Sequence, residues 1–448
     1  MDANSRISVL MFPWLAHGHI SPFLELAKKL SKRNFDIYLL STPANLSSIK
    51  QKIGEKFSIQ LVELHLPTLP NLPPQYHTTN GLPPNLMPTL KKAFDMANPN
   101  FAKILKTLKP DLLIYDFLQP WAPKVALEHN IPGVEFISSS ATMTAYMLDK
   151  YKNPGTGFPF PEIYYRNYEN VLVAKLRESS GIDANGKTRG IESMEQSSKI
   201  VLIKTFREIE GKYCGYVSKL GGKKVVPLGP LVQNPDYECE DSEIIQWLNK
   251  KGKNSTVFVS FGSEYFLSEE DLEEIAHGLA LSNVNFIWVV RFPMGESSRL
   301  EEALPLKFLQ KVGGRGMVVE GWAPQARILG HPSTGGFVSH CGWSSVIEGM
   351  KFGVPIIAMP MQLDQPINAR LIEEVGVGVE AVRDKNGRLQ REKVASVIKQ
   401  VVLEKEGEVV RKKARELSEN IRLKGDEEID VVVEELVNLE LHGNYYSL

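Results

Sequence analysis

Polar residues that could carry chemistry follow apolar runs at two separate places in this chain of 448 residues. In the first half, Gly18 and His19 come after the apolar run 7–12, where a helix-spaced segment begins. The positive end of a helix dipole disfavours a charged imidazolium, so the position favours a neutral histidine, as a general base must be. Asp116 follows the apolar run 112–115 and could orient such a histidine, as in an Asp–His–hydroxyl relay.

Each of these two residues also has an ordinary structural interpretation. His19 could cap a helix or fill a loop, and Asp116 could be the N-cap of the next helix. Both residues, however, come at the ends of strands that we expect to share one sheet, and ligands bind at such ends. We therefore expect His19 and Asp116 to meet in space as base and partner.

The segment 322–365 holds the strongest signal in the second half. Gly342 follows an apolar strand and precedes a helix-spaced segment, with His340 and Ser345 on either side. Gly342 permits close backbone approach, and a helix N-terminus offers N–H groups and a positive dipole. This combination predicts a cradle for a diphosphate, to which His340 and Ser345 would add side-chain donors.

Other residues of the same segment suit the rest of a nucleotide sugar. Glu348 lies one helical turn further on, where a carboxylate can accept from both hydroxyls of a ribose. Trp322 offers a flat face for a base, while Asp364 and Gln365 follow the next strand and suit sugar hydroxyls. A core tryptophan, a helix-initial serine and a capping aspartate are each plausible singly, but their coincidence within one short segment favours a ligand site.

The elements that must position these residues are short apolar runs separated by helix-length segments. This pattern of apolar runs and helix-length segments occurs twice along the chain. It predicts an α/β fold with two parallel sheets, each buried on both faces. In the first half the predicted strands are 7–12, 35–40, 112–115, 134–137 and 200–203. In the second half they are 256–261, 286–290, 317–319, 337–338 and 354–359.

Composition shifts suggest the domain limits. A stretch rich in Pro and Gly and then in acids predicts a linker at 229–245, between domains at 1–228 and 246–425. A charged helix at 426–448 is expected to pack back on the first domain. The proline-rich segment 66–84 predicts an irregular loop, and the polar segment 151–198 predicts helices near a substrate mouth.

Overall charge and cysteine usage exclude several classes of function. Lys and Arg total 52 and Asp and Glu total 53, so no global basic field would hold nucleic acid or an anionic membrane. The three cysteines are widely spaced without a CxxC pair, which favours a reducing, cytoplasmic location over disulfides or zinc. The chain has no run of 18 apolar residues, and its first apolar run suits a strand better than a signal peptide. Neither a P-loop nor a G-x-G-x-x-G pattern follows a first strand, which argues against an NTPase and a nicotinamide-dependent oxidoreductase.

The segment 322–365 resembles the 44-residue nucleotide-sugar box of plant family-one UDP-dependent glycosyltransferases. It has the Trp-Ala-Pro-Gln start, His-Cys-Gly-Trp, the glutamate, Gly-Val-Pro and the Asp-Gln end. The resemblance extends over the whole chain, including Gly18-His19 and Asp116. It implies the GT-B fold, in which two Rossmann-like domains face each other across the active site.

By position, the resemblance implies that His19 is the base, Asp116 its partner, and that Trp322 stacks on uracil. Gln325 would contact the uracil edge, Glu348 the ribose, and the sugar would lie by Trp343, Asp364 and Gln365. The donor-binding positions that it implies are Gly18, Ser138, Ser263, Trp322, Ala323, Gln325, His340, Gly342, Trp343, Ser344, Ser345, Glu348, Asp364 and Gln365. Ser344 departs from the asparagine that many members have, which puts a side-chain phosphate contact in doubt. In this family the final glutamine commonly goes with glucose, which favours UDP-glucose as the donor.

Three segments, 12–19, 77–83 and 205–213, are similar to the branch of the family that adds sugar to sugar. The resemblance is to enzymes that extend glucosides of crocetin, flavonoids or triterpenoids. It implies inverting transfer of glucose to a sugar hydroxyl with a β-1,6 or β-1,2 link, without cofactor or metal, by a cytoplasmic monomer. Direct glucosylation of an aglycone hydroxyl or carboxyl is the alternative. A nucleotide-sugar-binding protein without activity is disfavoured because His19 and Asp116 are both present.

Overall fold

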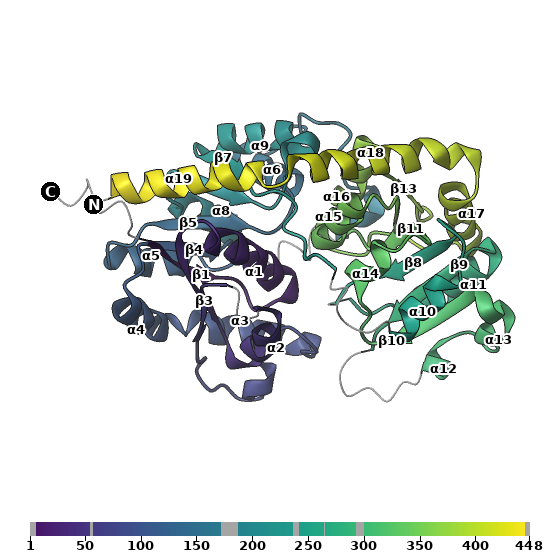
Figure 1. Cartoon of the computed structure of the whole chain (residues 1–448), viewed down its shortest axis with the longest axis horizontal. Coiled ribbons are helices and arrows are strands. Elements are labelled where there is room, and N and C mark those ends of the chain that lie inside the picture. The colour runs from purple at the N-terminus through teal and green to yellow at the C-terminus, as the bar shows by residue number, and fades with distance from the viewer. Residues whose placement is uncertain are drawn as a thin grey trace. The chain divides into compact units, whose positions relative to one another are not determined.

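The computed structural model describes residues 6–53, 57–171, 187–235, 242–263, 265–292 and 300–443. The chain divides into two compact units, the first comprising 1–157, 176–231 and 426–448, and the second 158–175 and 232–425. Each unit is built on one β-sheet with helices on both of its faces (Figure 1). The predicted α/β class with two parallel sheets is therefore confirmed.

The first unit has a seven-stranded sheet in the order β3-β2-β1-β4-β5-β6-β7, and all its neighbouring strands are parallel. Its strands are β1 (Ile7–Phe12), β2 (Phe35–Ser41), β3 (Ile59–Glu63), β4 (Leu112–Asp116), β5 (Gly133–Ile137), β6 (Ile200–Ile203) and β7 (Lys224–Pro227). Its helices are α1 (His17–Ser31), α2 (Pro43–Ile53), α3 (Met87–Asp95), α4 (Asn98–Leu108), α5 (Trp121–Glu128), α6 (Ala141–Lys152), α8 (Arg189–Gln196), α9 (Arg207–Gly221) and α19 (Glu427–Gly443).

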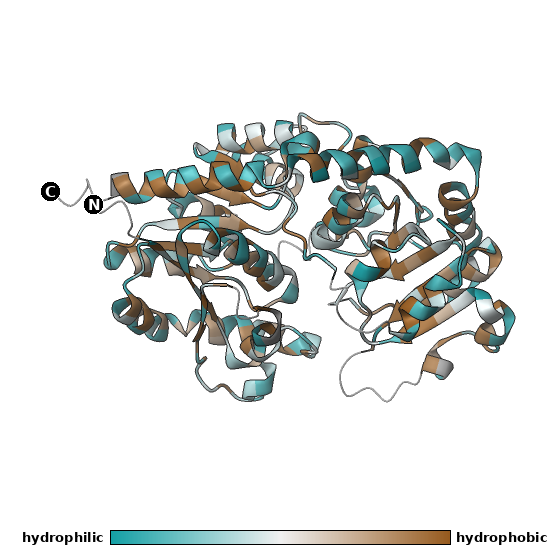
Figure 2. Cartoon of the chain, in the orientation of Figure 1, coloured by the Kyte–Doolittle hydropathy of each residue, from teal (hydrophilic) through white to brown (hydrophobic). Residues whose placement is uncertain are grey.

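Two apolar cores cover the two faces of this sheet. Val9 and Met11 of β1 pack with α1, α2 and α19 on one face, while Leu10 and Phe12 pack with α3, α4 and α5 on the other. Because neither face meets water, successive residues of a strand are both apolar, which explains why the strands read as continuous runs. Figure 2 accordingly shows the strands of both units largely in brown.

The second unit repeats this plan with six parallel strands in the order β10-β9-β8-β11-β12-β13. Its strands are β8 (Thr256–Ser260), β9 (Asn285–Val290), β10 (Gly316–Glu320), β11 (Thr334–Ser339), β12 (Ile356–Ala358) and β13 (Gly378–Glu380). Its helices are α10 (Glu243–Asn249), α11 (Glu269–Ser282), α12 (Leu300–Ala303), α13 (Phe308–Val312), α14 (Gln325–Leu329), α15 (Trp343–Phe352), α16 (Gln365–Val375), α17 (Arg391–Val402) and α18 (Glu408–Lys424). Val257 and Val259 contribute to the core under α11 and α17, and Phe258 to the core under α10 and α14.

The segment 158–171 departs from a contiguous division of the chain at one linker. It follows α6 of the first unit in sequence but belongs to the second unit. Its regular structure is the 3₁₀ turn η3 (Asn167–Glu169) and the first helical residues after it at 170–171, and within 151–198 the described residues also include the end of α6 and all of α8. Within the predicted linker 229–245, residues 236–241 lie outside the described part of the chain.

The helix α19 lies in the first unit although it follows the second unit in sequence. Ile429, Val432 and Leu436 are buried in the core formed by α1 and the sheet, and Lys29 and Arg33 of α1 pair with Asp426. No helix of the described residues combines the length and apolar character needed to cross a lipid bilayer.

Replacing Leu436 by alanine should destabilise the first unit. Leu436 is fully buried, so the substitution leaves a cavity that costs about 2–5 kcal/mol of unfolding free energy. Leu441→Ala is the matched control, because Leu441 is exposed on the same helix and its loss should cost about 0.5 kcal/mol or less. Chemical denaturation of both variants measures the difference, and equal stability of the two would show that α19 is not part of this core.

Candidate functional site

His19 and Asp116 meet at the carboxyl edge of the first sheet. His19 lies in the first turn of α1, directly after β1, and Asp116 is the last residue of the neighbouring β4. Nδ1 of His19 lies 2.7 Å from Oδ2 of Asp116, and the other oxygen of Asp116 accepts the Leu118 N–H at 3.2 Å. A carboxylate at Nδ1 keeps the proton on that nitrogen, so the lone pair that can accept a proton lies on Nε2.

The environment of this pair suits an acid–base role. Asp116 is fully buried, whereas the His19 side chain keeps about a fifth of its surface exposed. Ser138, which follows the next strand β5, places its hydroxyl 3.1 Å from His19 Nδ1. The Phe117 ring lies beside the imidazole, with 5.4 Å between ring centroids. The helix N-cap is Ala16, so His19 does not serve as that cap.

Two buried side chains that the sequence interpretation missed support this edge. Gln119 donates to the carbonyl of Phe12 at the end of β1 at 2.5 Å. Glu210 accepts the N–H groups of Ala141 and Thr142 at the start of α6, which follows Ser138. Glu210 lies within the segment 205–213 that carried the family resemblance, but its partners are about 70 residues away, so no local pattern could reveal this role.

In the second unit, His340 occupies a space that two glycines make available. A Cβ at Gly262 would lie 2.7 Å from His340 Nε2, and one at Gly342 would lie 2.5 Å from the same atom. Gly262 also has a φ of +81°, which L side chains rarely adopt. Burial lowers the pKa of His340 to about 4, against the opposing effect of the Ser260 carbonyl, so the ring is neutral at pH 7.

The loop after β11 leads directly into α15. Cys341 adopts a φ of +67°, and Gly342 is the N-cap of this ten-residue helix, which has no acidic side chain in its first turn. Trp343 and Ser345 are buried and Ser344 is half-buried. The helix therefore presents backbone N–H groups and a positive dipole end at this point, which suits an anion.

A tryptophan is exposed after β10. Trp322 has 62% of its surface accessible, an unusual exposure for a residue of this size. The guanidinium of Arg291 lies 5.3 Å from the centre of its ring and donates to the Gly321 carbonyl. Ser263, after β8, contacts the same arginine through its carbonyl at 3.5 Å. The indole is thus held in place with a large part of its surface open to a planar group.

Gln325 links this region to α15. Ala323 is buried and its carbonyl accepts the Gln325 N–H at 2.8 Å. The side-chain amide of Gln325 donates to Glu348 and lies 3.4 Å from the hydroxyl of Ser345. The predicted uracil, ribose and phosphate positions therefore adjoin one another in the second unit.

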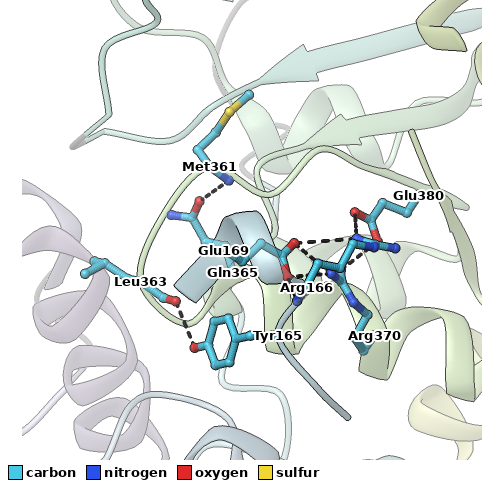
Figure 3. Close-up of polar contacts among 8 residues, drawn as sticks. All are labelled: Tyr165, Arg166, Glu169, Met361, Leu363, Gln365, Arg370 and Glu380. Atoms are coloured by element: carbon cyan, nitrogen blue, oxygen red, sulfur yellow. Dashed lines mark hydrogen bonds and ion pairs between the residues drawn. The ribbon is translucent and has the colours of Figure 1, made fainter. Parts of the chain in front are cut away.

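Gln365 is oriented by the backbone of its own turn. Its Oε1 accepts the N–H group of Met361 at 2.9 Å (Figure 3). The same oxygen accepts the N–H group of Gln362, also at 2.9 Å. This arrangement assigns the NH₂ group as the part of the amide that can donate to a ligand. Asp364 accepts from Asn368, which also donates to the carbonyl of Cys341 at 3.0 Å. The buried Asn368, another residue that the sequence interpretation missed, thereby joins the Asp364 turn to the loop before α15.

The predicted residues thus fall into two groups, one in each unit. Gly18, His19, Asp116 and Ser138 lie in the first unit, and the remaining predicted positions lie in the second. Ser138 was predicted to contact the donor sugar, and in the structure its hydroxyl lies next to the His19–Asp116 pair. Within the part of the chain that the structure describes, no group of three or more His, Cys, Asp or Glu residues could hold a metal ion.

Comparison with known proteins gives matches along the whole chain. The family described as "UDP-glucoronosyl and UDP-glucosyl transferase" matches residues 228–421, and that described as "Glycosyltransferase, N-terminal domain" matches residues 5–233. The Gardenia jasminoides protein named beta-D-glucosyl crocetin beta-1,6-glucosyltransferase is 52% identical, covering 96% of this chain and 98% of the relative. Flavanone 7-O-glucoside 2''-O-beta-L-rhamnosyltransferase of Citrus maxima is 48% identical, covering 97% and 98%.

A solved structure supports the fold. Glycyrrhiza uralensis UGT73P12, complexed with glycyrrhetinic acid 3-O-monoglucuronide, superposes with a TM-score of 0.83 at 23% identity. The match covers 98% of this chain and 97% of that chain. Together with the two parallel sheets, it confirms the predicted GT-B fold class.

Replacing Gly262 by alanine should destabilise the second unit. The new Cβ would adopt a left-handed backbone conformation and overlap His340, which together cost roughly 2–4 kcal/mol. Gly18→Ala is the matched control, because no atom lies within 4 Å of its would-be Cβ and alanine is favoured in a helix. Thermal or chemical denaturation compares the two variants. A Gly262→Ala protein as stable as the Gly18→Ala protein would contradict the placement of His340.

Proposed function

Because this chain belongs to the family of UDP-dependent glycosyltransferases, we propose that it transfers glucose from UDP-glucose to a sugar hydroxyl of a small glycoside. The observation that carries the proposal is the 2.7 Å contact between Nδ1 of His19 and the buried Asp116. The exposed Trp322 and the N-terminus of α15 in the second unit support it. Two relatives that match nearly the whole chain are named for transfer to glucosides, which supports a glycoside acceptor. Flavonoid, triterpenoid and apocarotenoid glucosides are the acceptor classes proposed.

We assign His19 as the general base. Its Nε2 removes the proton of the acceptor hydroxyl while the oxygen attacks the anomeric carbon of the donor sugar. Asp116 holds the ring in the required tautomer and stabilises the imidazolium that forms. UDP leaves from the opposite face, so an α-linked donor gives a β-glucoside. Gly18, whose missing side chain leaves open space beside His19, and Ser138 would adjoin the reacting sugars.

The second unit would hold the donor. Trp322 stacks on uracil with Ala323 and the Gln325 backbone at its edge, and Glu348 accepts from the ribose hydroxyls. The N-terminus of α15 with Gly342, Ser344 and Ser345 holds the diphosphate, together with His340 and Ser263. Trp343, Asp364 and Gln365 bind the hexose.

Charge that develops on the leaving UDP would be stabilised by groups already in place. The α15 N–H groups and the neutral His340 can donate hydrogen bonds without reorganisation. Such preorganised donors often make a large contribution to the rate enhancement of an enzyme. We therefore propose that no metal is needed. A cytoplasmic, monomeric enzyme remains our proposal, and the described Cys214 and Cys341 are both free thiols, as a reducing compartment would require.

His19→Ala should lower kcat by about 10²–10⁴-fold, because proton removal in the transition state contributes that factor. UDP binding should persist, since the predicted nucleotide contacts lie in the other unit. His17→Ala is the matched control on the same helix turn, where His17 is exposed. Steady-state rates and calorimetric UDP binding test the assignment, and a parallel loss of rate and UDP affinity would count against His19 as the base.

The acceptor class can be tested by pairing aglycones with their monoglucosides. With UDP-glucose as donor, we expect a higher kcat/KM for the monoglucosides, because the proposed acceptor group is a glucose hydroxyl. NMR of the product should place the new β-link at C6 or C2 of the first glucose. A higher kcat/KM for the aglycones would instead establish the alternative, direct glucosylation of an aglycone hydroxyl or carboxyl.

A further inference from the structure

The segment 163–169, called here the strap, packs on the turn that carries the proposed hexose-binding residues. Figure 3 shows Tyr165, Arg166 and Glu169 of the strap beside the 361–365 turn and Arg370. The strap precedes this turn by almost 200 residues in sequence, yet both lie in the second unit.

Four charged side chains form a buried network between the strap and the second unit. Arg370 of α16 donates to both oxygens of Glu169, at 2.7 and 2.8 Å, and to Glu380 of β13 at 2.6 Å. Arg166 donates from its guanidinium to Glu380 and from its backbone N–H to Glu169, each at 2.6 Å. Glu169, Arg370 and Glu380 are at most 2% exposed.

This network is electrically balanced, with two cations and two anions. Removing one member would leave a buried charge without its partner, which proteins tolerate poorly. The directional pairing of a guanidinium with a carboxylate also fixes relative orientation. The strap and the second turn of α16 are therefore held in one arrangement.

The strap also reaches the turn before α16. The Tyr165 hydroxyl donates to the carbonyl of Leu363 at 3.1 Å. Leu363 has a φ of +55°, a left-handed conformation that is costly for a leucine and requires external support. Tyr164 adds a contact with the Arg370 guanidinium, 5.3 Å from the ring centre. The turn is thus supported on the side of Leu363 and on the side of Arg370.

Asp364 and Gln365 lie between these two attachment points. Asp364 is the residue before α16 and Gln365 its first residue, with its amide oxygen directed at the backbone of the same turn. From this geometry we infer that Tyr165 and Glu169 are positioning residues for the donor hexose: they hold the turn in the conformation in which Asp364 and Gln365 meet the sugar. The inference rests on the proposed function of that pair.

A measurable signature follows from this arrangement. Because the strap contacts the turn and helix that carry the proposed hexose-binding residues, loosening it should weaken UDP-glucose binding much more than UDP binding. Tyr165→Phe removes a single hydrogen bond and should raise the KM for UDP-glucose by about 2- to 10-fold. Its inhibition constant for UDP, which has no hexose, should stay close to that of the unmodified enzyme.

The matched control for this variant is Tyr216→Phe. The hydroxyl of Tyr216 donates to Asp149 at 2.7 Å in the first unit. This substitution therefore removes a similar hydrogen bond at a place away from the strap. Glu169→Gln should raise the KM for UDP-glucose more than Tyr165→Phe does, because it removes one of the two negative charges that pair with Arg166 and Arg370 in the buried network. Its control is Glu274→Gln, which breaks an ion pair with Arg391 between α11 and α17. If Glu169→Gln fails to fold, Tyr165→Phe decides the question alone.

The variant Gln365→Ala separates failure of this inference from failure of the proposed function. If Gln365→Ala raises the KM for UDP-glucose and Tyr165→Phe does not, the strap has no positioning role. If Gln365→Ala leaves that KM unchanged, the hexose assignment is wrong and the inference is overturned with it. Equal changes in the UDP inhibition constant and the UDP-glucose KM of Tyr165→Phe would also overturn it. A double variant in which Tyr165→Phe adds little to Gln365→Ala would support action through the turn.

Discussion

Burial of both faces of each parallel sheet is the constraint on which the rest of this molecule depends. Helices cover both faces, so strand residues such as Val9 and Leu10 are apolar on either side and leave no room for polar chemistry. The carboxyl edge of each sheet is the place where strands end in loops and helices begin. His19, Asp116, Trp322 and His340 all occupy such edges, and the covering helices hold those edges in place.

Buried carboxylates show how the fold then secures its polar edges. Asp116 bonds to His19, Glu210 to the start of α6, and Glu169 to Arg370, so each of them orients a neighbouring group. Glu135, within β5, is a contrast, because burial raises its pKa well above the usual range and the nearby Asp116 acts in the same direction. Burial thus disfavours the charged form of Glu135, whereas Asp116, Glu210 and Glu169 are held in place by the hydrogen bonds that they accept.

Much of the fold could be predicted because its signals are local. Continuous apolar runs identified most strands, although the run 354–359 is paired only over Ile356–Ala358, since hydrogen bonding to neighbours decides where a strand ends. The Gly342 turn and the residues around it lie within one short segment of sequence. Their proposed roles could therefore be predicted from residue type and spacing alone. Segment 151–198 was poorly predicted because its described middle part, 158–171, has little regular structure and depends on distant partners.

By itself, the sequence determined the two-sheet α/β class, the strand-end positions of His19 and Asp116, and the nucleotide-sugar segment. Only the tertiary structure decided that His19 and Asp116, 97 residues apart, share one hydrogen bond. It also decided that Glu169 pairs with Arg370 across 201 residues, and that Asn368 joins two loops. The physical reason is that periodicity and turn chemistry act between near neighbours, whereas a buried polar contact depends on how separate elements pack. Each buried polar group needs a hydrogen-bond partner, and this need determines which of these contacts form. No single stretch of sequence shows which distant residue will be that partner.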